Sequence, residues 1–237
     1  MTEERLNAAR VATLFMLARP AYVTTVALAG ILVVALWAPY AAPLLLGWFA
    51  LICAVTLVRI GLHLRFVRAA PGGRNPLQWE NRFAFGALVS GAAWAFAGMV
   101  FFPESAPILQ VAVVMVIGGT VVGAAALYAS SLKALYAFGT LPLATLILQL
   151  LAHPQLTYQL LGLAIAIFGF VMARTAHVIR SNIDEIVAAN MRNQDLVERA
   201  SASERQLRDA IESFPEAIAI WSPQDRLVVC NDRYARL

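Results

Sequence analysis

The stretch LLGLAIAIFGFVMA (Leu160–Ala173) is followed directly by RTAHVIRSNIDEIVAANMRNQDLVERASASERQLRDAIESF (Arg174–Phe214). The first part is apolar enough to lie in a bilayer, and the second is polar and charged. No Pro or Gly occurs from Arg174 to Phe214, so we expect one helix to continue through both parts. A helix that leaves the membrane and enters water can transmit movement, which is typical of the input half of a signalling protein.

The composition is that of a membrane protein with a soluble appendage. The chain has 237 residues, of which 60% are hydrophobic and 14% charged, and its mean hydropathy is +0.70. Soluble domains are about one half apolar and about one quarter charged. Residues 1–173 hold nine basic and four acidic side chains, and residues 174–237 hold nine and ten. The net positive charge belongs to the membrane part, and since no basic stripe carries interleaved aromatic residues, we expect no nucleic-acid partner.

Six segments are apolar and, with their flanks, long enough to cross a hydrocarbon core of about 30 Å. They are Pro20–Trp37, Leu44–Leu64, Phe83–Phe102, Pro107–Tyr128, Ala134–Ala152 and Thr157–Ala173. The connections after the first, third and fifth segments contain no Lys or Arg, whereas the opposite side carries the basic residues, Arg74 among them. Because positive charge stays cytoplasmic, the sequence predicts an all-α, multi-pass membrane protein with both termini inside and the lipid bilayer as its partner.

The stretch before the first segment predicts a further helix. Leu6, Val11, Leu14, Phe15 and Ala18 fall on one helical face, which suits an amphipathic helix lying in the inner interface. The chain then divides into four regions. They are residues 1–19 (interfacial amphipathic helix), 20–173 (six-helix transmembrane sensor domain), 174–213 (signalling helix or coiled coil) and 214–237 (beginning of an α+β domain).

Few groups inside the six segments could carry chemistry. No Asp, Glu or Lys occupies the middle of a segment, which argues against an ion-coupled transporter. Arg59 lies near the inner end of the second segment, and we expect it to extend to the interface or to bind a lipid headgroup or an anionic ligand. Ser90, Trp94, Thr120 and Thr145 could line a small sensing pocket between the third, fourth and fifth segments, with Arg59 as a further candidate.

Two histidines are weak candidates for metal or haem ligands. His63 and His177 both fall near the inner face, and two imidazoles at one depth could bind such a group, although ordinary interfacial side chains are the alternative. We expect no catalytic residue, no resident metal and no cofactor in this chain.

Small residues indicate how the segments pack. Gly119 and Gly123 form a Gly-x-x-x-Gly pair in the fourth segment, and Gly91 lies on a small-residue face of the third. Such residues let helix backbones approach closely in lipid. We therefore expect these two faces to pack against each other, with a dimer seam as the alternative.

The polar continuation of the last segment carries a heptad pattern. Apolar and small residues alternate at spacings of four and three, with Asn190 at an a-like position. The seam includes Ile183, Ile186, Asn190, Val197 and Leu207. It predicts a weak parallel coiled-coil homodimer, with a single solvated helix as the alternative.

The end of the chain is LRDAIESFPEAIAIWSPQDRLVVCNDRYARL (Leu207–Leu237). We expect strands at Ala217–Trp221 and Arg226–Cys230, with Asn231 capping a following helix. These residues resemble the opening of a PAS domain, and the match ends before the ligand-holding half of that fold. The turn Gly of the family is Asp225 here, and Asp tolerates a left-handed conformation better than most residues.

The membrane part more loosely resembles the six-helix N-terminal regions of bacterial sensor histidine kinases and diguanylate cyclases. The likeness rests on WENRF (Trp79–Phe83) and SGAAW (Ser90–Trp94). It implies a two-component phosphorelay protein of the bacterial inner (cytoplasmic) membrane, with a response regulator as partner. ATP and Mg²⁺ would serve only a downstream kinase domain, because this chain has no ATP-binding glycine motif and His177 is followed by Val178, not by an acidic residue.

Two alternatives remain at the level of sequence. The same input region could control a diguanylate cyclase or phosphodiesterase, which residues beyond Leu237 would reveal. A small transporter or channel with a dimerising tail is the other, and it lacks the intramembrane charge that such a function favours.

Overall fold

The structure, a computed structural model, describes residues 3–70, 75–103 and 106–236. The chain forms two compact units, Met1–Glu185 and Ile186–Leu237, and their boundary lies within the last long helix. Arg74, expected among the inner basic residues, lies outside the described residues. The first unit contains the membrane helices and the second contains the hairpin, and each is described by itself.

Within the residues that the structure describes, seven helices begin in the first unit. They are α1 (Glu3–Leu17), α2 (Arg19–Ala35), α3 (Ala42–Arg68), α4 (Pro76–Val100), α5 (Pro107–Leu127), α6 (Leu132–Ala152) and α7 (Leu156–Ser213). Six helical stretches are long and apolar enough to cross a membrane, the first running from Leu6 to Ala35 through α1 and α2. The six expected segments are confirmed as helices, and the architecture fits an all-α membrane protein.

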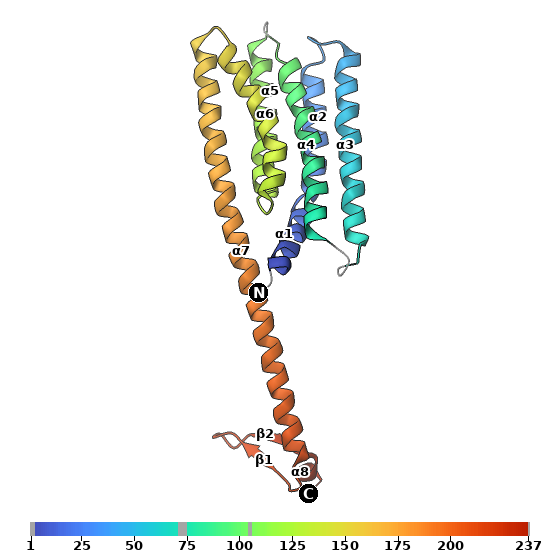
Figure 1. The fold of residues 1–237 in the computed structure, drawn as a ribbon, viewed down its shortest axis with the longest axis vertical. Helices are drawn as coiled ribbons and strands as arrows, with labels where there is room; N and C mark the ends of the chain where they lie inside the picture. The colour runs from blue at the N-terminus through green and yellow to red at the C-terminus, as the bar shows by residue number, and fades with distance from the viewer. Residues whose placement is uncertain (1–2, 71–74, 104–105, 237) are drawn as a thin grey trace. The chain divides into compact units, whose positions relative to one another are not determined.

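The helix starts follow from local sequence. A Pro stands in the first turn of α2, α3, α4 and α5, where its missing N–H costs no helical hydrogen bond. Two starts also have side-chain caps: Asn75 accepts from the backbone N–H of Gln78 in α4, and Ser131 accepts from that of Ala134 in α6. The last turn of α3 and the first turns of α4 and α6 lie at the end of the bundle near α1 (Figure 1).

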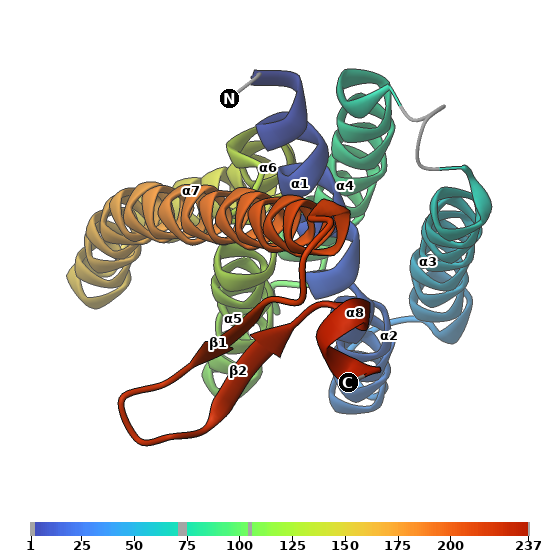
Figure 2. The ribbon, with the colours of Figure 1, turned by 90° about the horizontal axis from the view of Figure 1, so that it is seen from below.

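Helix α4 is the centre of the bundle. It packs against α6 and α3, while α2 packs against α3 and α5, and α5 also packs against α6. The end-on view shows α3 and the start of α7 at opposite sides of this group (Figure 2). The membrane part of α7 meets α6 through glycines: a Cβ on Gly162 would lie 3.1 Å from Leu150, and one on Gly169 would lie 2.4 Å from Leu143.

The apolar face of α1, which we expected in the inner interface, packs on protein in the described structure. Phe15 is buried and stacks on Phe66 of α3 with ring centroids 4.0 Å apart. Its edge contacts reach Trp79 at 6.0 Å and Phe83 at 5.2 Å on α4. The aromatic residues at the ends of α3 and α4 therefore cover the face that the sequence pattern assigned to lipid.

The prediction that the Gly91 face packs against the Gly119 and Gly123 face is wrong in part. Gly91 does mark a close approach, but its partner is α6: a Cβ there would lie 2.3 Å from the carbonyl oxygen of Phe138. Gly119 and Gly123 on α5 have no other described atom within 4 Å of where a Cβ would lie, beyond their own helix. Helices α4 and α5 touch, but not through these two glycines, because the small face of α4 is filled by the α6 backbone.

The second unit contains the rest of α7, strands β1 (Ala219–Trp221) and β2 (Leu227–Cys230), and the short helix α8 (Asp232–Ala235). The strands are antiparallel, as expected for the hairpin. Asp225 in the turn has a φ of 54° and takes the left-handed conformation that its position requires. Asn231 caps α8 by accepting from the N–H of Tyr234, which confirms the predicted cap.

Candidate functional site

Arg59 lies inside the bundle, not at its edge. Its side chain is 5% exposed, so the expectation that it extends to the interface is wrong. The stem passes Gly86 of α4, where a Cβ would lie 3.2 Å from Arg59 Cγ and 3.6 Å from Nε. Because Gly86 has no side chain, α4 leaves the space through which Arg59 enters.

Hydroxyl groups and aromatic rings surround the guanidinium. Arg59 Nη1 donates to Ser90 Oγ at 3.2 Å, and Nη2 donates to Tyr128 OH at 2.8 Å. Its Cζ lies 5.5 Å from the ring centroid of Tyr22, 5.2 Å from that of Phe83 and 5.5 Å from that of Tyr128. Ring faces attract a cation, more strongly where water is excluded. Among the described residues no carboxylate forms an ion pair with Arg59.

The other residues of the expected sensing pocket have separate contacts. Ser90 meets Arg59, as described. Trp94 is fully buried and packs edge-on against Trp48 at 5.4 Å. The hydroxyls of Thr120 and Thr145 donate to carbonyls of their own helices, Ile117 at 2.7 Å and Pro142 at 2.9 Å. These two hydroxyls therefore serve their own backbones.

The two histidines have different partners. His63 is buried, and its Nε2 accepts from Arg19 Nε at 3.3 Å. His177 is exposed and its Nε2 lies 3.0 Å from Tyr136 OH. Within the part of the chain that the structure describes, no group of three or more His, Cys, Asp or Glu side chains could hold a metal ion.

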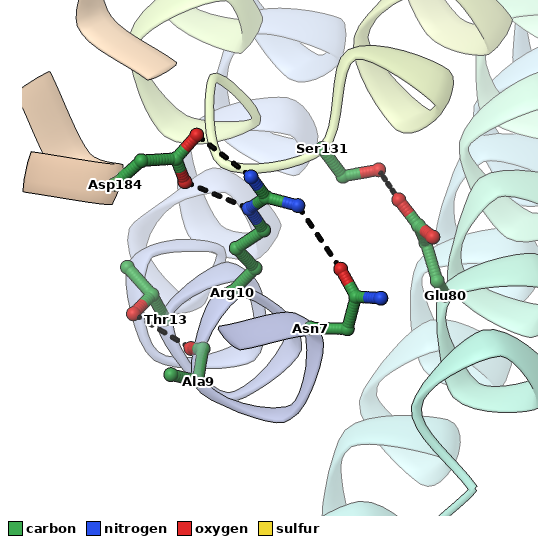
Figure 3. A network of polar contacts seen from close by, with 7 residues as sticks. All are labelled: Asn7, Ala9, Arg10, Thr13, Glu80, Ser131 and Asp184. Carbon is green, nitrogen blue, oxygen red and sulfur yellow. Dashed lines mark hydrogen bonds and ion pairs between the residues drawn. The ribbon is translucent and has the colours of Figure 1, made fainter. Parts of the chain in front are cut away.

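An ion pair joins α1 to α7, at the point where α7 has become polar (Figure 3). Arg10 Nε donates to Asp184 Oδ1 at 2.7 Å and Nη2 donates to Oδ2 at 2.8 Å, while Nη1 donates to Asn7 Oδ1 at 3.0 Å. Both side chains are partly buried, with 20% and 26% exposed. Sequence reasoning missed this pair because nothing local links residues so far apart in the chain. The bidentate geometry fixes the direction of the contact as well as its distance.

A small polar cavity adjoins this ion pair. Its volume is about 30 Å³, and its lining includes Arg10, Arg180, Glu80 and Ser130. Glu80 accepts from Ser131 at 2.5 Å, and the buried hydroxyl of Ser130 has no protein partner among the described residues. A space of this size and polarity suits one ordered water, not a larger ligand.

An apolar crevice lies beside the membrane part of α7. Its volume is about 220 Å³, and its lining comes from α5, α6 and α7, including Val121, Leu135, Gly139, Gly169 and Met172. Almost all of its surface is hydrocarbon, which suits an apolar molecule or lipid chain.

The heptad positions of the linker are mostly uncovered. In the first unit Ile183 is partly buried. In the second unit Ile186, Val197 and Leu207 are 60%, 68% and 63% exposed, and Asn190 is also exposed. Apolar side chains at this spacing on a polar helix gain stability when a second helix covers them.

Comparison with known proteins gives one short similarity. A stretch of 36 residues, 15% of this chain, is 56% identical to part of the Non-motile and phage-resistance protein of Caulobacter vibrioides. The chain spans about 4% of the length of that relative. No family model matches the chain, and no solved structure matches it.

Proposed function

We propose that this chain is the membrane input and signal-transmission region of a bacterial sensor protein, a PAS-containing sensor histidine kinase of a two-component system. Both termini are cytoplasmic, and the chain works as a homodimer. The stimulus is a small apolar ligand or the state of the bilayer.

The observation that carries this proposal is the continuity of α7. One helix runs from Leu156 to Ser213, and its sequence changes from apolar to polar at Arg174. A helix without a break transmits rotation or translation along its axis, whereas a flexible linker loses it. An input domain that must reach a soluble output needs this property.

In the first unit, α7 has few contacts with other helices, and this supports the proposal that it moves. Only 6% of its most apolar stretch is buried inside the protein, and the apolar crevice separates it in part from α5 and α6. A ligand or lipid chain that enters the crevice would press on Gly169 and Met172 of α7. The stimulus would thus act on the helix that transmits it.

The test is disulfide cross-linking along the linker of the 237-residue chain in membranes. Cys53 and Cys230 are first replaced by Ser, and single cysteines are placed at the seam positions Ile186, Val197 and Leu207. The matched off-seam positions are Ala188 and Ala202, which lie on the opposite face of the same helix. We expect dimers at the seam positions and few at the off-seam positions.

Equal cross-linking on both faces, or none on either, would contradict a paired signalling helix. Output is measured separately on the full-length protein with labelled ATP. We expect phosphate on a histidine downstream of this chain, and a seam cross-link at Ile186 should change its rate. Autophosphorylation of the 237-residue chain alone would contradict the assignment of catalysis to a downstream domain.

A further inference from the structure

We infer that the groove between α3 and α4 binds the headgroup of an anionic phospholipid. The groove has a volume of about 610 Å³ and is formed by one face of each helix near the end of α3 and the start of α4. Nothing in the proposed signalling function requires this site, and the inference does not depend on that function.

The lining is basic at one end. This end has Arg65 of α3 with Arg82 and Asn81 of α4, while Arg59 lies farther along α3 beside Val58, and no acidic residue is among the described lining residues. Arg65, Arg82 and Asn81 are exposed. Arg82 Cζ lies 5.2 Å from the ring centroid of Trp79, and Asn81 Oδ1 accepts from Lys133 Nζ, which leaves the guanidinium N–H groups and the Asn81 amide N–H groups directed to ligands from outside. Guanidinium groups match phosphate oxygens in charge and in the geometry of their N–H donors.

The lining is apolar at the other end. Val58 and Phe85 are 73% and 67% exposed. Val58 precedes Arg65 by two helical turns, or about 10 Å at 1.5 Å per residue. If the acyl chain of a phospholipid lay along Val58 and Phe85, the phosphate of its headgroup would reach the level of Arg65 and Arg82. The apolar side chains would thus meet the acyl chain, and the basic side chains would meet the anionic headgroup.

Arg59 adds a charge that lacks a counterion. Its guanidinium is held by two hydroxyls and three rings, and in the described part of the chain it has no carboxylate partner. A buried charge is stabilised by an opposite charge nearby, because the surroundings screen it poorly. Arg59 is also among the lining residues of the groove, so an anion bound there would bring an opposite charge toward this cation.

A phospholipid fits this lining better than a free anion does. The side chains of Val58 and Phe85 are presented outward on membrane helices, where lipid is the surrounding medium. A free phosphate ion would use the arginines and leave the apolar end without a ligand group. Basic pockets between membrane helices are a known form of headgroup recognition.

The test uses the purified 237-residue chain in detergent, titrated with phosphatidylglycerol and observed by native mass spectrometry. We expect phosphatidylglycerol adducts at concentrations about tenfold or more below those needed for phosphatidylcholine. The double variant Arg65→Gln, Arg82→Gln should reduce phosphatidylglycerol binding by at least about tenfold. The control is Arg68→Gln, which removes an exposed arginine from the last turn of α3 outside the groove lining, and it should bind like the parent chain.

Each other outcome overturns the inference. An equal loss in Arg68→Gln would mean that general surface charge attracts the lipid. Equal affinity for phosphatidylcholine would remove the role of the anionic headgroup. Displacement of phosphatidylglycerol by millimolar inorganic phosphate would indicate a site for free anions. Melting curves of each variant are recorded first. If the double variant has a lower melting temperature than the parent chain, phosphatidylglycerol binding is measured on the single variant Arg65→Gln instead.

Discussion

Helices α4 and α7 both have the length and hydropathy of membrane spans, but the protein uses them differently. Of the most apolar stretch of α4, 56% is buried inside the protein, against 6% for that of α7. Helix α4 carries small residues that bring α6 to backbone contact at Gly91. Helix α7 instead presents large apolar side chains such as Phe170 and Ile167 outward.

The difference distinguishes two roles. Helix α4 and the helices packed against it form a rigid group, which we call the frame, whereas α7 is free enough to transmit movement. A helix in close contact on several sides has one position, because any shift would create overlap or voids. A helix with few protein contacts exchanges one set of lipid contacts for another at little cost. The four changes below test whether stability resides in the frame and is nearly absent from the membrane part of α7.

The largest effect is expected at Gly91. A Cβ there would meet the Phe138 carbonyl oxygen at 2.3 Å, and a backbone atom cannot rotate away. Gly91→Ala should destabilise the bundle by about 3 kcal/mol or more, measured by unfolding the detergent-solubilised chain in increasing SDS. Gly119→Ala is the control, expected within about 0.5 kcal/mol of the parent, and similar losses in the two variants would contradict the α4–α6 contact.

The second effect concerns the hydroxyl that holds Arg59. Tyr128→Phe keeps the ring near the cation and removes the acceptor of the 2.8 Å hydrogen bond. We expect a loss of about 1–2 kcal/mol in the same unfolding assay, because a bond to a charged group is lost in a buried place. The matched control is Tyr22→Phe, whose ring also faces Arg59 but whose hydroxyl has no protein partner among the described residues. A greater loss in Tyr22→Phe would be inconsistent with this arrangement.

The third effect is at the ion pair between α1 and α7. Asp184→Asn removes the carboxylate that Arg10 binds, and we expect a loss of about 1 kcal/mol because the pair is only partly buried. Amide hydrogen exchange around residue 184 should rise, since α7 loses its attachment to α1. Glu185→Gln changes an exposed neighbour and should leave exchange as in the parent chain. The exchanged pair Arg10→Asp, Asp184→Arg should recover part of the protection, and no recovery would argue against a direct contact.

The smallest effect is expected on the outer face of α7. Phe170 is 69% exposed, so Phe170→Ala removes few contacts within the protein. The free energy of unfolding should stay within about 0.5 kcal/mol of the parent value. Phe138→Ala, a change of the same size in a buried position on α6, should cost about 3 kcal/mol or more. A large loss for Phe170→Ala would mean that α7 is part of the frame after all.

Much of the fold could be predicted from sequence because it depends on local composition. The six spans follow from hydropathy, which the bilayer enforces through the need to satisfy every backbone group. The hairpin followed from its turn and the cap from its residue type: Asp225 takes the left-handed conformation and Asn231 caps α8. These features need only a few neighbouring residues to decide them.

The contacts between helices could not be predicted in the same way. Small-residue faces occur on α4 and on α5, and the pattern does not say which backbone fills which face. Arg59 was expected at the interface because it lies near the inner end of the second segment. Its environment comes from Tyr22 on α2, Phe83 on α4 and Tyr128 directly after α5, and from the missing side chain at Gly86. Such sites depend on the arrangement of the helices, which a single-sequence pattern does not contain.

The unbroken course of α7 also limits how its length can change. Each added residue turns the following part of an α-helix by about 100° and advances it by about 1.5 Å. One residue inserted between Ile186 and Leu207 would thus turn the seam at Leu207 away from the face set by Ile186, while seven would restore it almost fully. Lengthening or recombination within this helix should therefore preserve function only in steps of about seven residues.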